Sequence, residues 1–166
     1  MGHDPHQALT TILPRLFAFA RTMLGDADAA HDLVQEAATR ALAAHRVPTD
    51  PPAYRAWLFC IVRNAALDEL RRRRRPEPTN VGAVDIWGFD DASIAKITVE
   101  QGLTVLPPAH REIISLIDIA GFSYGEAAEV LGVPAGTIMS RIARARSALL
   151  AAIEASSVRP LKSRHG

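Results

Sequence analysis

The sequence predicts an all-α protein made of two small helical domains joined by a flexible linker. Alanine, leucine and arginine are abundant and aromatic residues make up only 5% of the 166 residues. This composition favours helices, because these side chains lose little rotamer freedom in them. Apolar residues also recur with helical spacing on both sides of a segment rich in Pro, Gly and acids. We place this linker at residues 76–91, between domains at residues 1–75 and 92–166.

Three helices are predicted in the first domain. The first covers about residues 6–24, and Pro14 marks either a kink or the true start of this helix. The second is capped by Asp26 or Asp28 and continues to about residue 45. Its apolar positions form one stripe, which consists of Ala30, Leu33, Val34, Ala37, Ala38, Ala41 and Leu42.

The third helix begins near Pro52 and ends in five consecutive arginines, residues 71–75. Its inward stripe is Tyr54, Trp57, Leu58, Ile61 and Ala65. Arg55, Phe59 and Arg63 fall on the other side of the helix. An exposed Phe59 ring flanked by cations would be able to stack on an unpaired base. Packing of Phe59 on a neighbouring helix is the alternative.

The second domain is predicted to contain a helix-turn-helix. Helices are expected at residues 93–105 and 109–120. Ser123 and Glu126 then form a capping box for a short helix, and Gly132 supplies a turn before a long helix that opens at Pro134. Small residues and arginines occupy the outward side of the long helix near its start: Ala135, Gly136, Thr137, Met139, Ser140, Arg141 and Arg144. This pattern favours DNA binding over an ordinary helical hairpin with a basic solvated face.

Charge is distributed unevenly although the net charge is only +1. Residues 55–75 contain seven arginines and two acids, and residues 134–166 contain six basic residues and one acid. Acidic segments lie at residues 26–36 and 77–91. Two separated basic patches indicate two contacts with a polyanion.

The sequence argues against an enzyme and against a secreted protein. The six histidines have no metal-ligand spacing, and no phosphate-binding loop or nucleophile motif occurs, so we expect neither a metal nor a cofactor. Cys60 is the single cysteine and lies in an apolar run, which fits buried filler in a reducing compartment. No apolar run reaches the length of a membrane span, and no secretory signal is visible. We therefore expect a cytoplasmic protein without membrane insertion.

Four segments together resemble the extracytoplasmic-function (ECF) sigma factors of the sigma-70 family. Residues 29–42 (AAHDLVQEAATRAL) are similar to the family's core-binding helix, and residues 56–73 (AWLFCIVRNAALDELRRR) to its minus-10 recognition helix. Residues 106–113 (LPPAHREI) and 136–146 (GTIMSRIARAR) resemble its minus-35 domain. The resemblance implies a region 2-like bundle and a region 4-like helix-turn-helix.

The resemblance also implies partners and site residues. The partners would be core RNA polymerase, promoter DNA and an anti-sigma protein. Asp32, Gln35 and Glu36 would contact the clamp helices of the largest polymerase subunit. A base flipped from the minus-10 element would lie by the loop of residues 46–52. The implied minus-10 residues are Arg46, Arg55, Phe59, Arg63, Asn64, Arg71 and Arg72, and the implied minus-35 residues are Thr137, Met139, Ser140, Arg141 and Arg144.

Two of these positions have particular features. Asn64 falls close to the inward face of its helix, so a satisfied buried amide is the alternative reading of that residue. Met139 stands where the family commonly has a basic residue, which predicts an apolar contact.

Two alternative functions are compatible with parts of the pattern. A sigma-like decoy would bind a sigma regulator without touching DNA, but the arginine run and the intact helix-turn-helix argue against it. A free-standing helix-turn-helix regulator would bind duplex DNA without polymerase. The polar positions Asp32, Gln35 and Glu36 in a helix unlike a ligand sensor argue against that reading.

Overall fold

The computed structural model describes residues 4–74 and 91–157, and these two ranges contain helices and turns but no β-strand. The predicted all-α fold is confirmed. The predicted linker lies outside the described residues except for Asp91, which begins a helix. The basic C-terminal tail, residues 158–166, also lies outside them.

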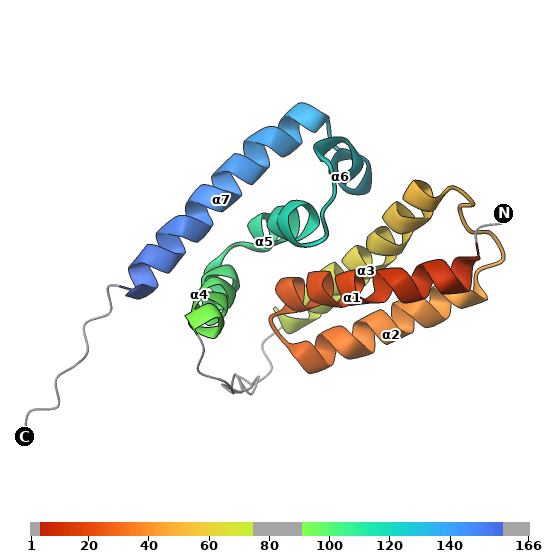
Figure 1. Ribbon diagram of the computed structural model, residues 1–166, viewed down its shortest axis with the longest axis horizontal. Helices are drawn as coiled ribbons and strands as arrows, with labels where there is room; N and C mark the ends of the chain where they lie inside the picture. Colours follow the sequence, from red (N-terminus) through yellow and green to blue (C-terminus); the bar gives the residue numbers. More distant parts are fainter. Residues whose placement is uncertain (1–3, 75–90, 158–166) are drawn as a thin grey trace, which may run out of the picture.

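The first three helices form a bundle (Figure 1). They are α1 (Pro5–Leu24), α2 (Ala27–Ala43) and α3 (Pro51–Arg73). Each follows an aspartate, Asp4, Asp26 or Asp50, whose carboxylate accepts hydrogen bonds from backbone N–H groups of the first turn. These caps matter because the first N–H groups of a helix have no partner within the helix. Gly25 ends α1 with a φ of +69°, a conformation that favours glycine.

Helix α1 is one helix that passes through Pro14. The alternative that Pro14 starts the helix is therefore wrong. Proline lacks the N–H that would bond to the carbonyl of Thr10, and its ring crowds that carbonyl. Both Pro14 and Thr10 are exposed, which leaves water able to satisfy the carbonyl.

The second group of helices begins with α4 (Asp91–Val105) and α5 (Pro108–Ile114). The single helix expected over residues 109–120 is instead α5 followed by one π-helical segment, η1 (Ser115–Ile119). The buried Ser115 hydroxyl donates to the carbonyl of Arg111 at 2.6 Å, and the Ala120 amide donates to the Ser115 carbonyl at 2.8 Å. A hydroxyl that competes for a helix carbonyl is a local reason for the changed hydrogen-bond pattern.

The predicted helix-turn-helix is formed by α6 (Tyr124–Leu131) and α7 (Ala135–Ser157). The capping box is present in both directions: the Ser123 amide donates to Glu126 at 2.8 Å, and the Glu126 amide donates to the Ser123 hydroxyl at 3.1 Å. Gly132 makes the turn with a φ of +64°. Ile138 and Ile142 of α7 are buried, while Leu131 and Val133 at the turn are half-buried.

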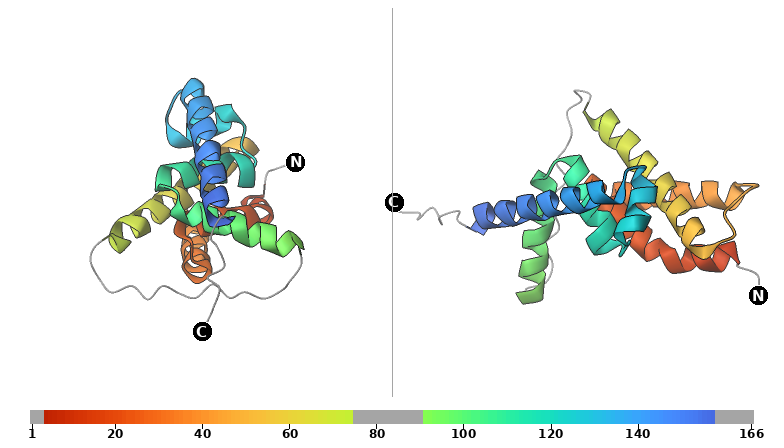
Figure 2. Two further views of the ribbon diagram at one scale, coloured as in Figure 1. Left: turned by 90° about the vertical axis from the view of Figure 1, so that its left-hand side faces the viewer. Right: turned by 90° about the horizontal axis from the view of Figure 1, so that it is seen from above.

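Helix α7 packs along α4, and Gly102 of α4 lies at the crossing. A Cβ atom added at Gly102 would lie 3.0 Å from Leu149 Cδ1 and 3.1 Å from Ile153 Cγ1. The absence of a side chain therefore lets the two helices approach closely. Figure 2 shows α7 extending away from the three-helix bundle beyond this crossing.

The two groups of helices pack against each other. Helix α1 contacts α5 and η1, and α3 contacts α6. Arg21 of α1 also lies 3.3 Å from Glu100 of α4. One continuous set of buried residues consequently extends from the bundle into the helix-turn-helix domain.

Candidate nucleic-acid and protein interfaces

The outward face of α2 carries Asp32, Gln35 and Glu36, and all three are exposed. They lie beside the buried stripe of Ala30, Leu33, Val34, Ala37 and Ala41, whereas Leu42, also predicted in that stripe, is 49% exposed. Helix periodicity produces this arrangement because buried and exposed positions alternate about every half turn. Asp32 and Gln35 can meet a partner from solvent, and Glu36 can do so by exchanging its exposed ion pair with Arg40, which lies 2.5 Å away on the same helix.

Two hollows flank this face of α2. The first has a volume of about 350 Å³ and lies between α2 and α3, with Asp32, Glu36, Asp68 and Glu69 among its lining residues. The second, of about 520 Å³, lies between α1 and α2 and is mainly apolar. Gln35 lines this second hollow. The first hollow is also lined by Arg40 and Arg72, so it carries both signs of charge with an excess of acids. A charged hollow beside an apolar one is suited to a protein partner that presents both charged and apolar side chains.

The apolar hollow contains residues that sequence reasoning missed. Phe17 of α1 and His31 of α2 line it, and their rings stack with centroids 4.0 Å apart. The sequence around His31 has no metal-ligand spacing and gives no sign of a ring contact. Helical spacing places Phe17 between buried neighbours, so the sequence carries no signal that its ring faces an open groove.

The residues predicted around the minus-10 face occupy three different environments. Arg46, in the loop between α2 and α3, is exposed, and so are Arg71 and Arg72 near the end of α3. Arg71 pairs with Asp68 at 2.8 Å and Arg72 with Glu69 at 3.0 Å on the same helix. Such exposed pairs are weak and can be exchanged for phosphate contacts. Asn64 is exposed too, so the alternative of a buried amide is wrong.

Arg73 differs from its neighbours in the arginine run. Its Nη1 donates to the carbonyl of Leu24 at 3.0 Å, and its Nε donates to Glu69 at 3.1 Å. Nη2 also lies 3.8 Å from Asp26. Arg73 therefore ties the end of α3 to the junction of α1 and α2. Consecutive arginines look alike in the sequence, and only the tertiary contact distinguishes this one.

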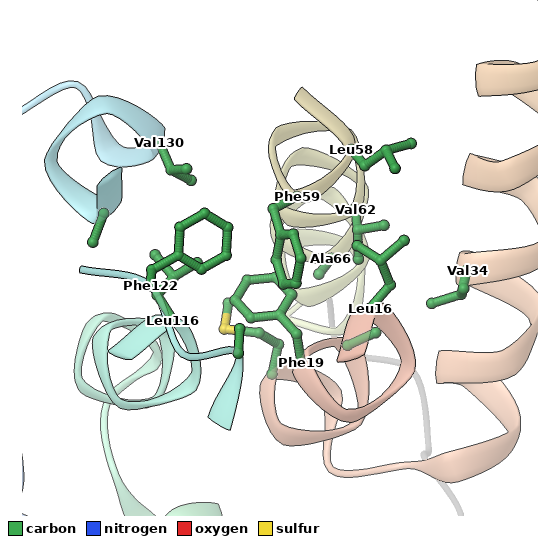
Figure 3. Packing of buried hydrophobic residues seen from close by; sticks show 14 of the residues in the cluster. Leu16, Phe19, Val34, Leu58, Phe59, Val62, Ala66, Leu116, Phe122 and Val130 are labelled. Carbon is green, nitrogen blue, oxygen red and sulfur yellow. The ribbon is translucent and has the colours of Figure 1, made fainter. Parts of the chain in front are cut away.

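Phe59 is fully buried, so the expectation of an exposed ring is wrong for this arrangement. The ring lies between Phe19 and Phe122, at centroid distances of 5.4 Å and 4.8 Å, with an edge-to-face geometry to each (Figure 3). Packing on a neighbouring element, the alternative left open by the sequence, is what the structure shows. Within the predicted inward stripe, Leu58 is buried but Trp57 and Ile61 are only half-buried. Val62, which was not part of that stripe, is buried.

Arg55 and Arg63 are also covered rather than solvent-facing. Arg55 Nη2 donates to the carbonyl of Ala120 at 2.7 Å, and its guanidinium carbon lies 4.0 Å from the centroid of the Phe122 ring. Arg63 donates to the carboxylate of Glu112, which is itself buried. Burial lowers the pKa of Arg55, although the guanidinium still has Glu126 at 4.0 Å as an acidic neighbour.

The helix-turn-helix presents a basic surface at the start of α7. Met139, Ser140, Arg141 and Arg144 are exposed, and Thr137 is half-buried. The Ser140 hydroxyl donates to the carbonyl of Thr137 at 3.0 Å, which leaves its lone pairs able to accept a hydrogen bond.

The backbone at this end of α7 is accessible as well, since Ala135 and Gly136 are exposed and nothing lies within 4 Å of a Cβ built at Gly136. A helix N-terminus with short residues and guanidiniums can approach a DNA groove closely. Arg146, by contrast, is held by two hydrogen bonds to Asp118, at 2.6 and 3.1 Å.

Within residues 4–74 and 91–157, no cluster of three or more His, Cys, Asp or Glu side chains is placed to hold a metal ion. In the same ranges, no helix combines the length and the apolarity needed to cross a membrane.

Comparison with known proteins identifies both groups of helices. Residues 9–76 match the model of Sigma-70 region 2, and residues 97–149 match that of Sigma-70, region 4. The ECF RNA polymerase sigma factor EcfG of Rhodopseudomonas palustris is 39% identical over 145 residues, which cover 84% of this chain and 79% of the relative. ECF RNA polymerase sigma factor SigC of Mycobacterium tuberculosis is 37% identical over 145 residues, covering 79% of this chain and 74% of SigC.

Solved structures agree. Sigma factor RpoE from Bartonella quintana, in complex with the anti-sigma factor NepR, matches with a TM-score of 0.75 and 33% identity, over 93% of this chain and 98% of RpoE. CnrH, in complex with the cytosolic domain of CnrY, matches with a TM-score of 0.68 and 31% identity, over 91% and 88% of the two chains. The chain therefore belongs to the ECF sigma factors of the sigma-70 family, which direct core RNA polymerase to promoters.

Proposed function

We propose that this sigma factor divides its work between three surfaces. The outward face of α2 binds core polymerase, the outer side of α3 with the preceding loop binds the minus-10 element, and the start of α7 binds the minus-35 element. The corresponding domains are residues 1–75 and 92–166, with residues 76–91 as the linker. The chain itself catalyses no reaction and acts in the cytoplasm, where its polymerase is.

The observation that carries this division is the separation of charge between the two exposed faces. Asp32 and Glu36 give α2 an acidic face, whereas Arg141 and Arg144 give the start of α7 a basic one. An acidic surface repels DNA and suits a basic protein partner, while exposed guanidiniums attract phosphates. The polymerase contact and the minus-35 contact are accordingly assigned to different domains.

We further propose that an anti-sigma protein controls this chain. Support comes from RpoE and CnrH, each of which was solved with a bound protein: the anti-sigma factor NepR for RpoE, and the cytosolic domain of CnrY for CnrH. The apolar hollow between α1 and α2 offers an apolar surface for such a partner.

Paired variants test the division of work. In Arg141→Ala and Arg144→Ala, we expect promoter-specific run-off transcription to fall while binding to purified core polymerase is unchanged. In Asp32→Ala and Glu36→Ala, we expect binding to core polymerase to fall, and run-off transcription to fall only as a consequence of that loss. Lys96→Ala and Glu129→Ala, which remove exposed charges elsewhere, serve as matched controls. Loss of core binding in the arginine variants, with the controls unaffected, would contradict the assignment.

A further inference from the structure

Helix α7 meets the rest of the second domain through a stripe of apolar side chains. Ile138, Ile142 and Ala145 are buried and share one side of the helix, because they are spaced four and three residues apart. Apolar attraction is not directional, so it defines the rotation of the helix about its own axis less sharply than hydrogen bonds do. Side chains lie about 5–6 Å from a helix axis, and a rotation of about 10° therefore moves them by roughly 1 Å.

A directional ion pair between α7 and η1 lies at the edge of this stripe. Nη2 of Arg146 donates to Oδ1 of Asp118 at 2.6 Å, and Nε of Arg146 donates to Oδ2 at 3.1 Å. Two hydrogen bonds to one carboxylate fix the plane of a guanidinium as well as its distance. The hydrogen bonds to Asp118 raise the pKa of Arg146, and Tyr124 at the start of α6 contributes to the same shift.

Asp118 belongs to a segment that leads directly into the helix-turn-helix. It lies in the π-helical segment η1, and π-helical turns are rare and occur frequently at functional sites. The Phe122 amide donates to the Leu116 carbonyl at 2.9 Å, which ties the end of η1 to the chain that enters α6. Arg146 lies about three turns into α7. The ion pair consequently joins α7 to the α6 side of the motif at a second place, far from the turn at Gly132.

The ion pair and the DNA-facing arginines lie on opposite flanks of the apolar stripe. At 100° per residue, Arg146 is about 70° from the centre of the stripe in one direction, and Arg141 is about 70° from it in the other. Arg141 and Arg144 are exposed. A rotation that moved Arg146 by 1 Å would lengthen its hydrogen bonds beyond the ordinary range and would turn Arg141 by the same angle.

We propose that Arg146 is a positioning residue for minus-35 recognition: braced by Asp118, it fixes the rotation of α7 and so the direction in which Arg141 and Arg144 meet the DNA. This inference rests on the proposed minus-35 role of the start of α7. The side chains of Arg146 and Asp118 are 49% and 38% exposed, and an ion pair so exposed adds little to stability. Its loss should therefore affect recognition more than folding.

The sign of one substitution separates bracing from a simple effect of charge. Asp118→Ala removes a negative charge from a DNA-binding domain, and charge alone would then strengthen DNA binding. Bracing predicts the reverse, a loss of promoter discrimination as large as that in Arg146→Ala. The double variant should lose no more than either single variant, because both substitutions remove the same contact.

The experiment measures discrimination at the minus-35 element by run-off transcription with the assembled holoenzyme. Selection from a promoter library first identifies a sequence that the wild-type holoenzyme prefers. The transcript yield from that promoter is then divided by the yield from a copy with a scrambled minus-35 element. A phosphate contact carries no sequence information, so loss of such a contact alone would lower both yields and leave the ratio unchanged.

We expect the ratio to fall roughly ten-fold in Arg146→Ala, in Asp118→Ala and in the double variant, which is the discrimination of about one base contact. Asp118→Asn keeps the shape of the side chain but offers only one acceptor oxygen, so it should lower the ratio as well. Glu129→Ala removes another exposed acid of the same domain and should keep the wild-type ratio. Far-UV circular dichroism verifies that each variant is folded.

Arg141→Ala makes the two possible failures distinguishable. If it lowers the ratio while Asp118→Ala and Asp118→Asn keep the wild-type value, the brace is overturned and the minus-35 role of α7 stands. A double variant that loses much more than either single variant would also overturn the brace. A wild-type ratio in Arg141→Ala would overturn the minus-35 role itself and, with it, the brace.

Discussion

Arg72 and Arg73 are adjacent arginines that should respond to substitution in opposite ways. Arg73 donates to the Leu24 carbonyl at the end of α1 and to Glu69, and its side chain is only 29% exposed. Arg72 pairs with Glu69 at 3.0 Å but is 72% exposed. Alanine at either position removes one positive charge, so the two variants form a matched pair.

The expected loss in Arg73→Ala follows from its contacts. A hydrogen bond that involves a charged group contributes about 1.5–3 kcal/mol, and the partly exposed ion pairs with Glu69 and Asp26 add less than about 1 kcal/mol. The Leu24 carbonyl is one of the last four of α1 and has few other partners. We expect a free energy of unfolding lower by about 2 kcal/mol, which corresponds to a fall in Tm of roughly 4–8 °C for a chain of this size.

Arg72→Ala should leave Tm nearly unchanged and weaken DNA binding instead. Loss of one phosphate contact lowers the slope of log affinity against log salt by roughly 0.7–0.9. Thermal unfolding followed by circular dichroism, together with a salt titration of DNA binding in the presence of core polymerase, measures both effects. Equal Tm values for the two variants would refute the structural role of Arg73, and an unchanged salt slope in Arg72→Ala would refute its DNA contact.

Three further predictions concern the second domain. Ile138 is fully buried, so Ile138→Ala should lower the free energy of unfolding by about 2–5 kcal/mol, measured by chemical denaturation. Met139 is 59% exposed, so Met139→Ala should leave stability unchanged and alter base preference at the minus-35 element, measured by selection from a promoter library. The Ser123 amide, which donates to the Glu126 carboxylate, is the main cause of the lowered pKa of Glu126. The folded pKa therefore lies below the ordinary 4.5, and the stability from this contact is present above pH 4.5 and lost as pH falls through the folded pKa. In Glu126→Gln, urea midpoints should decline less steeply over that acidic range, and a parallel decline would contradict the contact. Gly102→Leu should lower Tm by forcing α4 away from α7, because even a Cβ atom at Gly102 would lie 3.0 Å from Leu149 Cδ1. A wild-type Tm in this variant would show that the crossing is not tight.

Local features of the sequence predicted most of the elements correctly. The capping box of Ser123 and Glu126, the turn at Gly132 and the cap at Asp26 each depend on residues a few positions apart, which the sequence displays directly. The exposed faces of α2 and α7 follow from helical periodicity in the same way. The family resemblance added the order of the two domains.

The faces of α3 were harder to predict because that helix has two buried sides. Periodicity identifies one inward stripe, and Phe59 was placed outside it. In the structure, Leu58 and Val62 face the bundle while Phe59 meets Phe122 of the other domain (Figure 3). Contact between domains joined by a linker depends on residues far apart in sequence, and no local pattern encodes it. For the same reason, the sequence does not distinguish the structural role of Arg73 from the exposed position of Arg72.

Helix α7 runs without interruption from its exposed first turn to the crossing with α4 at Gly102. With a rise of about 1.5 Å per residue, the first turn lies roughly 20 Å from Leu149 at that crossing. A tilt of about 10° there would move the first turn by about 3.5 Å, close to the ~3.4 Å spacing of successive bases along one strand. If the first turn of α7 reads the minus-35 element as proposed, the packing between α4 and α7 helps to determine, from a distance, which base step that turn meets.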